Sequence, residues 1–283
     1  MEKLKAALDK ARLQREANAA SSPENRFAPT AGSVAVRDAQ MTAAPTDKEA
    51  AWATLSPFSP DLRKVGRRRV VSLSAGAEAI SYDILRTKVL QLTSAHGWQR
   101  IAITSPLAGS GKTTTAINLA TSLARQGDRR VILVDLDMRR PGLATLLGAP
   151  AGANVSDVLE GKVPFSEQAF RIGDGLAVSI NFTTKQAAAD LLLRRRSAET
   201  IDEIERAFQP DFMIFDMPPM LVGDDASAFL GNVDCAILVA EAGSTTTTQV
   251  DTCEKELAEQ TNVLGVVLNK CRFGLEGKAG YYY

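Results

Sequence analysis

The chain has 283 residues, of which 45% are hydrophobic and 23% charged, and its formal net charge is zero. This length accommodates one domain of roughly 200 residues with a full core, plus additional segments. The balanced charge argues against nonspecific nucleic-acid binding, so we expect no nucleic-acid partner. No run of about 18 apolar residues is present to span a membrane, and the charged N-terminus lacks the apolar core of a secretory signal.

The first 70 residues divide into two stretches of different composition. Residues 1–19 have the pattern of a short helix with Leu4 and Leu8 on one face, and such a helix is marginal in water unless it docks onto something. Residues 20–70 are dominated by Ala, Ser, Pro and Thr, which predicts a flexible linker. A basic patch at 63–69 ends this linker and is either a solvated face or a surface for anionic lipid.

From residue 71 to residue 272 we expect one α/β domain, because apolar strand patterns alternate with helical patterns. The strands are continuously apolar, which predicts a mostly parallel sheet with helices on both faces. Such a sheet binds ligands at the carboxyl ends of its strands. We expect helices at 78–92, 112–126, 198–208 and 246–260, and strands at 100–105, 131–135, 212–216, 235–240 and 263–269.

A P-loop follows the first strand of this domain. Residues 105–113 read Ser-Pro-Leu-Ala-Gly-Ser-Gly-Lys-Thr and open a helix, which is the context that a P-loop requires. Backbone N–H groups at the glycines and the helix N-terminus would bind phosphate oxygens, Lys112 would reach the β- and γ-phosphates, and the Thr113 hydroxyl would ligate Mg²⁺. The predicted ATP- and phosphate-binding residues of the loop are Gly109, Ser110, Gly111, Lys112, Thr113 and Thr114.

Carboxylates follow two of the predicted buried strands. Asp135 ends one strand, Asp137 comes two residues later, and Asp216 ends another. Charges at the end of a buried strand are costly without a cation, whereas opposite ATP and Mg²⁺ they have a role. Asp216 suits the Walker B role of holding Mg²⁺ directly or through water. The sequence therefore predicts one site for ATP and Mg²⁺ at this edge of the sheet.

Three of the four tyrosines, Tyr281, Tyr282 and Tyr283, are the last residues of the chain. They follow a polar, glycine-containing stretch, so we expect 273–283 to be a mobile tail. Exposed phenols in a chain with an ATP site indicate recognition or phosphorylation of these tyrosines, and a frayed aromatic end is the alternative. The fourth, Tyr82, lies in a predicted helix and is expected to pack or to lie at a subunit contact.

In combination these motifs resemble those of the bacterial tyrosine kinases (BY-kinases), the autokinases of capsule and exopolysaccharide assembly. That family combines a Walker A loop, a strand followed by Asp-x-Asp-x-Arg, a strand ending Asp-x-Pro-Pro, and a C-terminal tyrosine cluster. Residues 135–139 (Asp-Leu-Asp-Met-Arg), 216–219 (Asp-Met-Pro-Pro) and 281–283 match these patterns. The resemblance covers about 72–283 and implies a P-loop NTPase fold of the deviant Walker A type.

The resemblance also implies an activity and residue roles. The chain would phosphorylate its tyrosine tail with ATP and thereby regulate polysaccharide polymerisation and export. Asp137 would help to deprotonate the attacking tyrosine, Asp135 and Asp216 would hold Mg²⁺ together with Thr113, and Asn269 would lie near the adenine. The catalytic residues implied in this way are Lys112, Asp135, Asp137 and Asp216.

Partners and location follow from the same resemblance. Family members carry a membrane-spanning chain-length regulator in the same polypeptide or meet it as a separate adaptor. Without a predicted span, this chain is expected to be of the second kind, cytoplasmic and peripheral to the inner face of the membrane. A cognate tyrosine phosphatase and a homo-oligomer are further implied partners. Three cysteines without metal-type spacing fit a reducing cytoplasm.

Three features depart from the family pattern. Pro106 stands where the P-loop consensus has its first glycine. The family's helix before the sheet carries Glu-x-x-Arg-x-x-Arg for ring assembly, whereas this chain has Ile80, Asp83 and Arg86, so ring formation stays open. The tyrosine tail is also short.

Two other functions remain open at the level of sequence. One is a positioning ATPase similar to the septum-site and plasmid-partition proteins, which carry an extra lysine near the start of the P-loop; none lies between Gln99 and Lys112 here. The other is a nucleotide-binding scaffold with little kinase activity. The tyrosine tail is unexplained if the chain is a positioning ATPase, whereas the scaffold would serve only as a phosphorylation-dependent partner.

Overall fold

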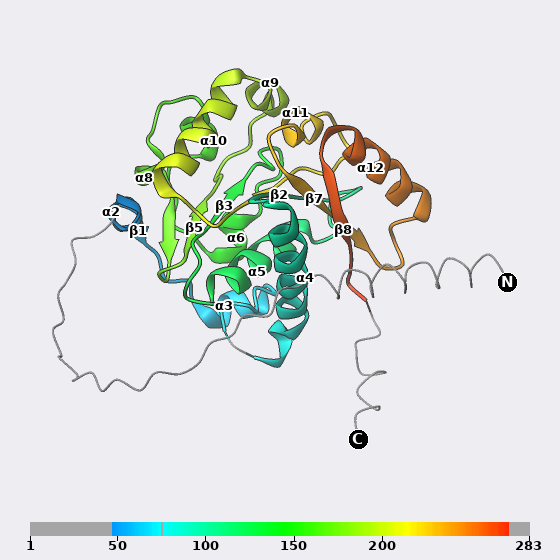
Figure 1. The fold of residues 1–283 in the computed structure, drawn as a ribbon, viewed down its shortest axis with the longest axis horizontal. Helices are drawn as coiled ribbons and strands as arrows, with labels where there is room; N and C mark the ends of the chain where they lie inside the picture. The colour runs from blue at the N-terminus through cyan, green and yellow to red at the C-terminus, as the bar shows by residue number, and fades with distance from the viewer. Residues whose placement is uncertain (1–46, 75, 272–283) are drawn as a thin grey trace, which may run out of the picture. The chain divides into compact units, whose positions relative to one another are not determined.

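The computed structural model describes residues 47–74 and 76–271, which are built around an eight-stranded sheet (Figure 1). The predicted helix at 1–19, the linker up to residue 46 and the tail at 273–283 with its tyrosines lie outside the described residues. Within the described part of the chain, no helix has the length and apolar character needed to cross a membrane.

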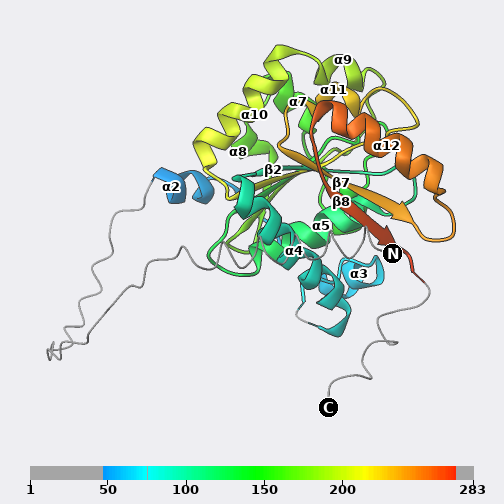
Figure 2. The ribbon, with the colours of Figure 1, turned by 45° about the vertical axis from the view of Figure 1, so that its right-hand side comes forward.

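The strands lie in the order β1-β4-β5-β3-β6-β2-β7-β8, and every neighbouring pair is parallel except β4 and β5. The predicted mostly parallel sheet is therefore confirmed, and β8 is its outer strand beside β7 (Figure 2). The three strands that were not predicted, β1, β4 and β5, have only two to four residues. The strands are β1 (Ser56–Pro57), β2 (Arg100–Thr104), β3 (Val131–Asp135), β4 (Phe170–Ile172), β5 (Leu176–Ser179), β6 (Phe212–Asp216), β7 (Cys235–Glu241) and β8 (Asn262–Asn269).

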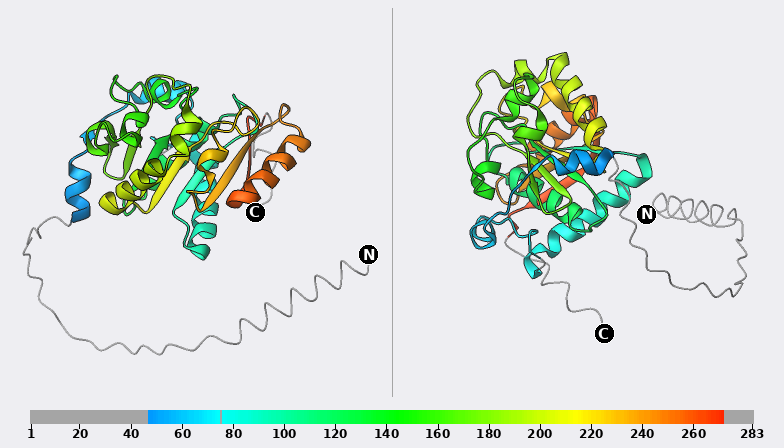
Figure 3. Two further views of the ribbon diagram at one scale, coloured as in Figure 1. Left: turned by 90° about the horizontal axis from the view of Figure 1, so that it is seen from above. Right: turned by 90° about the vertical axis from the view of Figure 1, so that its left-hand side faces the viewer.

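Helices cover both faces of the sheet, as the continuous apolar strands predicted. Alternate residues of β3 belong to different cores, with Leu133 on one face and Ile132 on the other. Figure 3 shows the sheet between the layer that contains α4 and the layer that contains α10. One layer comprises α3 (Leu62–Arg67), α4 (Ile80–His96, preceded by a 3₁₀ turn, Ala77–Ala79), α5 (Lys112–Ala124) and α6 (Leu143–Leu147). The other comprises α2 (Asp47–Ala53), α7 (Val155–Leu159), α8 (Phe165–Gln168), α9 (Ala188–Leu192), α10 (Arg195–Phe208), α11 (Ser227–Leu230) and α12 (Thr247–Gln260).

Residues 47–70 differ from the predicted flexible linker, because they fold onto the domain. Trp52 of α2 is 1% exposed, and its indole N–H donates to the carbonyl of Phe208 at 2.7 Å. Val65 and Val70, around α3, are also buried. The prediction of a linker was wrong here. Composition shows that this segment has few apolar residues, but it cannot show that those few pack into the core of the domain. The basic side chains of the patch at 63–69 are exposed.

In the helix before the sheet, α4, the side chains of Asp83 and Arg86 are bound within the chain. Asp83 accepts from Arg86 at 2.9 Å and from the Ser122 hydroxyl at 2.6 Å. It also pairs with Arg125 at 2.5 Å. Tyr82 is half-buried against α5, and burial raises the pKa of its phenol. Of the two expectations for Tyr82, the structure bears out packing.

Candidate nucleotide-binding and phosphoryl-transfer site

The carboxyl ends of β2, β3 and β6 meet at one edge of the sheet. These strands are parallel neighbours, with β6 between the other two. In their register Asp135 lies opposite Asp216, and Asp216 lies opposite Ile103. The P-loop begins at Ser105, directly after β2. The parallel sheet thus brings all three motifs together, as expected for strand ends of this architecture.

The P-loop glycines adopt the backbone conformation that the motif needs. Gly109 and Gly111 have φ of 89° and 93°, which side-chain-bearing residues rarely adopt. Asn269, at the end of β8, donates from Nδ2 to the carbonyl of Ser110 at 2.9 Å. A Cβ on Gly111 would lie 2.1 Å from that Nδ2 atom. The predicted phosphate-binding loop and Asn269 therefore do lie side by side.

Pro106 fits the loop despite the departure from the consensus. Its carbonyl accepts from the backbone N–H of Leu221 at 3.1 Å, in the segment after β6. The Ser110 hydroxyl donates to the carbonyl of Leu107 at 3.0 Å. Thr113 and Thr114 lie in the first turn of α5 and are half-buried. The start of the loop is thus held by backbone bonds that require no glycine.

Lys112 joins the two acidic motifs. Its Nζ lies 2.7 Å from Oδ2 of Asp137 and 3.3 Å from Oδ1 of Asp216. Burial alone would lower the pKa of Lys112, but the carboxylates, Asp216 foremost, raise it above its usual value. The lysine is therefore charged, and it partly neutralises the acidic cluster.

Asp135 and Asp216 are fully buried, and burial raises the pKa of both carboxyls. For Asp135 the negative charge of Asp216 adds to this effect, so the shift is large. The Oδ2 atom of each has no hydrogen-bond partner. A buried oxygen without a partner is costly, and a cation would satisfy it.

These two oxygens make the site fit Mg²⁺. The Thr113 hydroxyl lies 3.2 Å from Nζ of Lys112 and also interacts with the Asp216 carboxylate, so it is next to both groups. Mg²⁺ commonly takes one or two carboxylates and completes its shell with phosphate oxygens and water. Among the described residues, no three His, Cys, Asp or Glu side chains form a complete metal-binding group.

Three residues around the acidic motifs were not predicted. Asp225 pairs with Arg139, with 2.5 Å between Oδ2 and Nε. Asn181 donates from its side chain to the carbonyl of Asp135 at 2.7 Å, and the N–H of Lys185 donates to the carbonyl of Met138 at 2.9 Å. Asp225 lies shortly after the Asp-x-Pro-Pro motif, and this proximity in sequence is the signal that could have indicated it. The loop with Asn181 and Lys185 carries no motif that would have indicated it.

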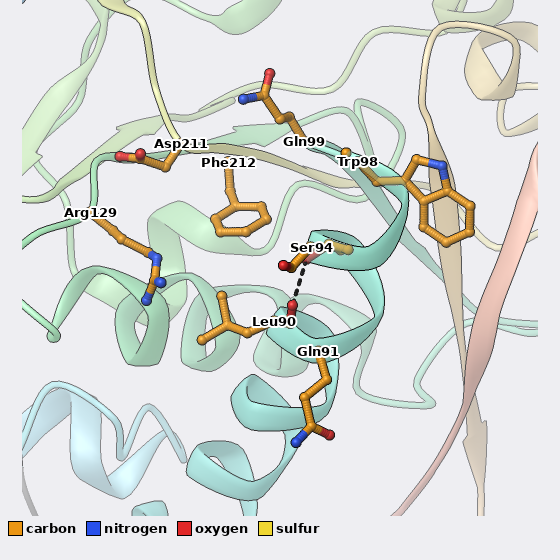
Figure 4. A pocket seen from close by; sticks show the side chains of 10 residues that line it. Leu90, Gln91, Ser94, Trp98, Gln99, Arg129, Asp211 and Phe212 are labelled. Atoms are coloured by element: carbon orange, nitrogen blue, oxygen red, sulfur yellow. Dashed lines mark hydrogen bonds between the residues drawn. The ribbon is translucent and has the colours of Figure 1, made fainter. Parts of the chain in front are cut away.

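A cavity of about 520 Å³ lies at the opposite edge of the sheet. Leu90 of α4, Trp98, Arg129 and Phe212 are among its lining residues, and Figure 4 shows Phe212 between the segments that carry Leu90 and Arg129. Because Phe212 begins β6 and Asp216 ends it, this cavity lies at the amino-terminal ends of the strands. It is separate from the P-loop site.

Comparison with known proteins agrees with this geometry. The model of the CobQ/CobB/MinD/ParA nucleotide binding domain family matches residues 101–279. The tyrosine-protein kinase YwqD of Bacillus subtilis is 32% identical over 205 residues, which cover 71% of this chain and 84% of that protein. The kinase domain of the Escherichia coli tyrosine kinase ETK superposes with a TM-score of 0.63 at 25% identity, covering 74% of this chain and 81% of that chain.

Other relatives are much longer than this chain. The succinoglycan biosynthesis transport protein ExoP of Rhizobium meliloti is 30% identical over 184 residues, which cover 63% of this chain but only 23% of that protein. The similarity is therefore to a part of ExoP.

Proposed function

Because this chain belongs to the bacterial tyrosine kinases within the CobQ/CobB/MinD/ParA nucleotide-binding family, we propose that it phosphorylates its own C-terminal tyrosines with ATP and Mg²⁺. The observation that carries this proposal is the cluster of Lys112, Asp137 and Asp216 directly beside the P-loop. It combines a phosphate-binding cation with a carboxylate able to accept a proton.

In the proposed reaction a tyrosine oxygen attacks the γ-phosphorus of ATP, and the bond to the ADP oxygen breaks. The phenol proton passes to Asp137, because a phenol of pKa about 10 is a poor nucleophile without a proton acceptor. Lys112 leaves Asp137, binds the phosphates and neutralises negative charge on the transferred phosphoryl group. The P-loop amides, with Gly109 and Gly111 in the required conformation, bind the phosphate oxygens.

Mg²⁺ held by Asp135, Asp216 and Thr113 would supply further positive charge at the phosphates. The two carboxylate oxygens without partners support this assignment. Asn269 would lie near the adenine, and its hydrogen bond to the carbonyl of Ser110 would hold the P-loop beside it.

The length of the chain after β8 is sufficient for the C-terminal tyrosines to reach such a site. β8 ends at Asn269 beside the P-loop, and Tyr283 is 283 − 269 = 14 residues further along. At ~3.3–3.6 Å per residue this segment spans up to roughly 46–50 Å, so its length permits reaction within one chain or between two. A phosphorylated tail carries about −1.5 to −2 charges per tyrosine and would be repelled by Asp135 and Asp137, which favours release.

The biological role that we propose is regulation of exopolysaccharide or capsule polymerisation and export. Support comes from the relatives, which are named as tyrosine-protein kinases and, for ExoP, as a succinoglycan biosynthesis transport protein. We place the chain at the cytoplasmic face of the membrane through a chain-length regulator that acts as adaptor, with a cognate tyrosine phosphatase to reverse the modification. A homo-oligomer would bring a tail to a neighbouring site.

Labelling of the purified chain with [γ-³²P]ATP and Mg²⁺, followed by phosphoamino-acid analysis, tests the proposal. Phosphotyrosine that forms only with ATP supports autokinase activity. ATP hydrolysis without phosphotyrosine would favour a positioning ATPase, and nucleotide binding without turnover would favour a scaffold.

A further inference from the structure

Arg139 and Asp225 form a two-point ion pair between the loops that follow β3 and β6. Nε of Arg139 lies 2.5 Å from Oδ2 of Asp225, and Nη2 donates to Oδ1 at 3.2 Å. Asp225 is 3% exposed, whereas the side chain of Arg139 is 45% exposed. A guanidinium fork fixes the direction of a carboxylate as well as balancing its charge. The pair therefore holds the two loops in a defined geometry.

Arg139 lies inside the turn that carries Asp137. The backbone N–H of Arg140 donates at 3.2 Å both to the carbonyl and to Oδ1 of Asp137. The direction of the Asp137 carboxylate is thus set by the turn 137–140, in which Arg139 is a central residue. Anchoring Arg139 restricts this turn and, through it, the Asp137 carboxylate.

The partner loop is anchored on the P-loop. The backbone N–H groups of Met220 and Leu221 donate to the carbonyls of Ser105 and Pro106 at 2.9 and 3.1 Å. Asp225 comes four residues after Leu221, in the same loop. A continuous chain of bonds consequently connects the start of the P-loop to the turn of Asp137.

We propose that Arg139 and Asp225 are positioning residues for phosphoryl transfer. They hold the Asp137 turn against the loop that is bonded to the P-loop, so that Asp137 keeps its place when Lys112 leaves it for the phosphates. Neither residue touches the reacting atoms in this account. The inference rests on the proposed role of Asp137 as proton acceptor.

A double-mutant cycle on the full chain tests the pair, with Arg139→Met, Asp225→Asn and the combination of both. Asp225→Asn is the variant that best preserves the fold, because the arginine left without a partner is partly exposed to water. We expect each single variant to lower kcat for phosphotyrosine formation about tenfold, with KM for ATP and the affinity for a fluorescent ADP within about twofold of wild type. The double variant should be no slower than either single one, and Arg139→Lys should recover part of the rate.

Three results would overturn the inference: kcat unchanged in both single variants, losses that multiply in the double variant, or ADP affinity that falls in step with kcat. The last would indicate a general structural role. Asp137→Asn separates this inference from the function on which it rests. If Asp137→Asn abolishes phosphotyrosine while Arg139→Met and Asp225→Asn keep the wild-type kcat, only the positioning role is wrong. If Asp137→Asn keeps the wild-type kcat, the proton-acceptor role fails and the inference falls with it.

Discussion

Nζ of Lys112 lies 2.7 Å from Oδ2 of Asp137, so the lysine of the P-loop and the proposed proton acceptor form an ion pair. Both side chains are nearly buried, which strengthens the pair relative to one in water. Phosphates that attract Lys112 would release the Asp137 carboxylate at the same time. In the proposed reaction, ATP binding would thus make the proton acceptor available.

Lys112→Met removes the cation from this cluster. We expect phosphotyrosine formation to fall by at least about 100-fold, comparable to the loss of a transition-state hydrogen-bond donor. The melting temperature should also fall, because Asp137 and Asp216 lose their partner. Radiolabelling and thermal melts measure the two effects.

Lys88→Met, which alters an exposed lysine of α4, serves as the control and should behave as wild type. The combination of Lys112→Met with Asp137→Asn should regain part of the lost melting temperature without regaining activity. Wild-type labelling in Lys112→Met would show that this loop is not the catalytic ATP site.

Two glycines of the P-loop provide a matched pair of variants. A Cβ on Gly111 would lie 2.1 Å from Nδ2 of Asn269, whereas a Cβ on Gly109 meets nothing within 4 Å. Both residues have positive φ, so both variants carry backbone strain of roughly 1 kcal/mol. Only Gly111→Ala must also displace Asn269 from Ser110.

We therefore expect Gly111→Ala to weaken ADP binding at least about tenfold more than Gly109→Ala, a difference of about 1.4 kcal/mol. Titration with a fluorescent ADP measures this. Equal losses in the two variants would argue that contact with Asn269 does not matter for nucleotide binding.

Glu160, at the end of α7, pairs with Lys185, whose backbone N–H donates to the carbonyl of Met138 next to Asp137. It lies 2.5 Å from Nζ of Lys162 and 2.6 Å from Nζ of Lys185, and these lysines, Lys162 first, lower its pKa to about 2. A carboxyl with a lowered folded-state pKa stabilises the fold above its unfolded pKa, and this contribution is lost as the pH falls toward the folded-state value.

Glu160→Gln should accordingly destabilise the protein at neutral pH by about 1 kcal/mol or less, since the pair is partly exposed to solvent. The difference from wild type should shrink as the pH falls from about 4.5 toward about 2. Urea unfolding of both chains across this range is the measurement. A difference that stays constant or grows in acid would contradict the assigned ion pairs.

Trp52→Ala tests the part of the chain that composition assigned to a linker. Removing a buried tryptophan should cost about 3–5 kcal/mol of unfolding free energy. Trp52→Phe keeps an aromatic ring but loses the hydrogen bond to the carbonyl of Phe208, and should cost less than Trp52→Ala, with about 1 kcal/mol coming from the lost bond. Unfolding free energies equal to wild type would mean that α2 does not pack on the domain.

The sequence predicted most of the sheet because its central strands are continuous apolar runs, such as Val131–Asp135. It also predicted that the P-loop and the strand-end carboxylates would meet, since the carboxyl ends of parallel strands share one edge. It did not predict the packing of Trp52. It also did not predict the pairing of Arg139 with Asp225, which are 86 positions apart in the sequence. Contacts of that kind depend on three-dimensional neighbours, and neither composition nor periodicity reports them.

The ion pair of Lys112 was likewise not predicted. From the motif, Lys112 was expected to face phosphates, whereas here its ammonium group binds Asp137 and Asp216. The motif identifies the lysine, but it does not report the buried carboxylates that approach it from the ends of β3 and β6.

The most direct test of the central claim is to map the phosphorylated residues after incubation of the full chain with ATP and Mg²⁺. We expect phosphate on Tyr281, Tyr282 or Tyr283 and loss of most labelling when all three are changed to phenylalanine, with ADP binding unchanged. Tyr82→Phe is the matched control. We expect this variant to be labelled as strongly as wild type, because Tyr82 is half-buried against α5. Phosphate found chiefly on Tyr82, or full labelling of the triple variant, would contradict the account.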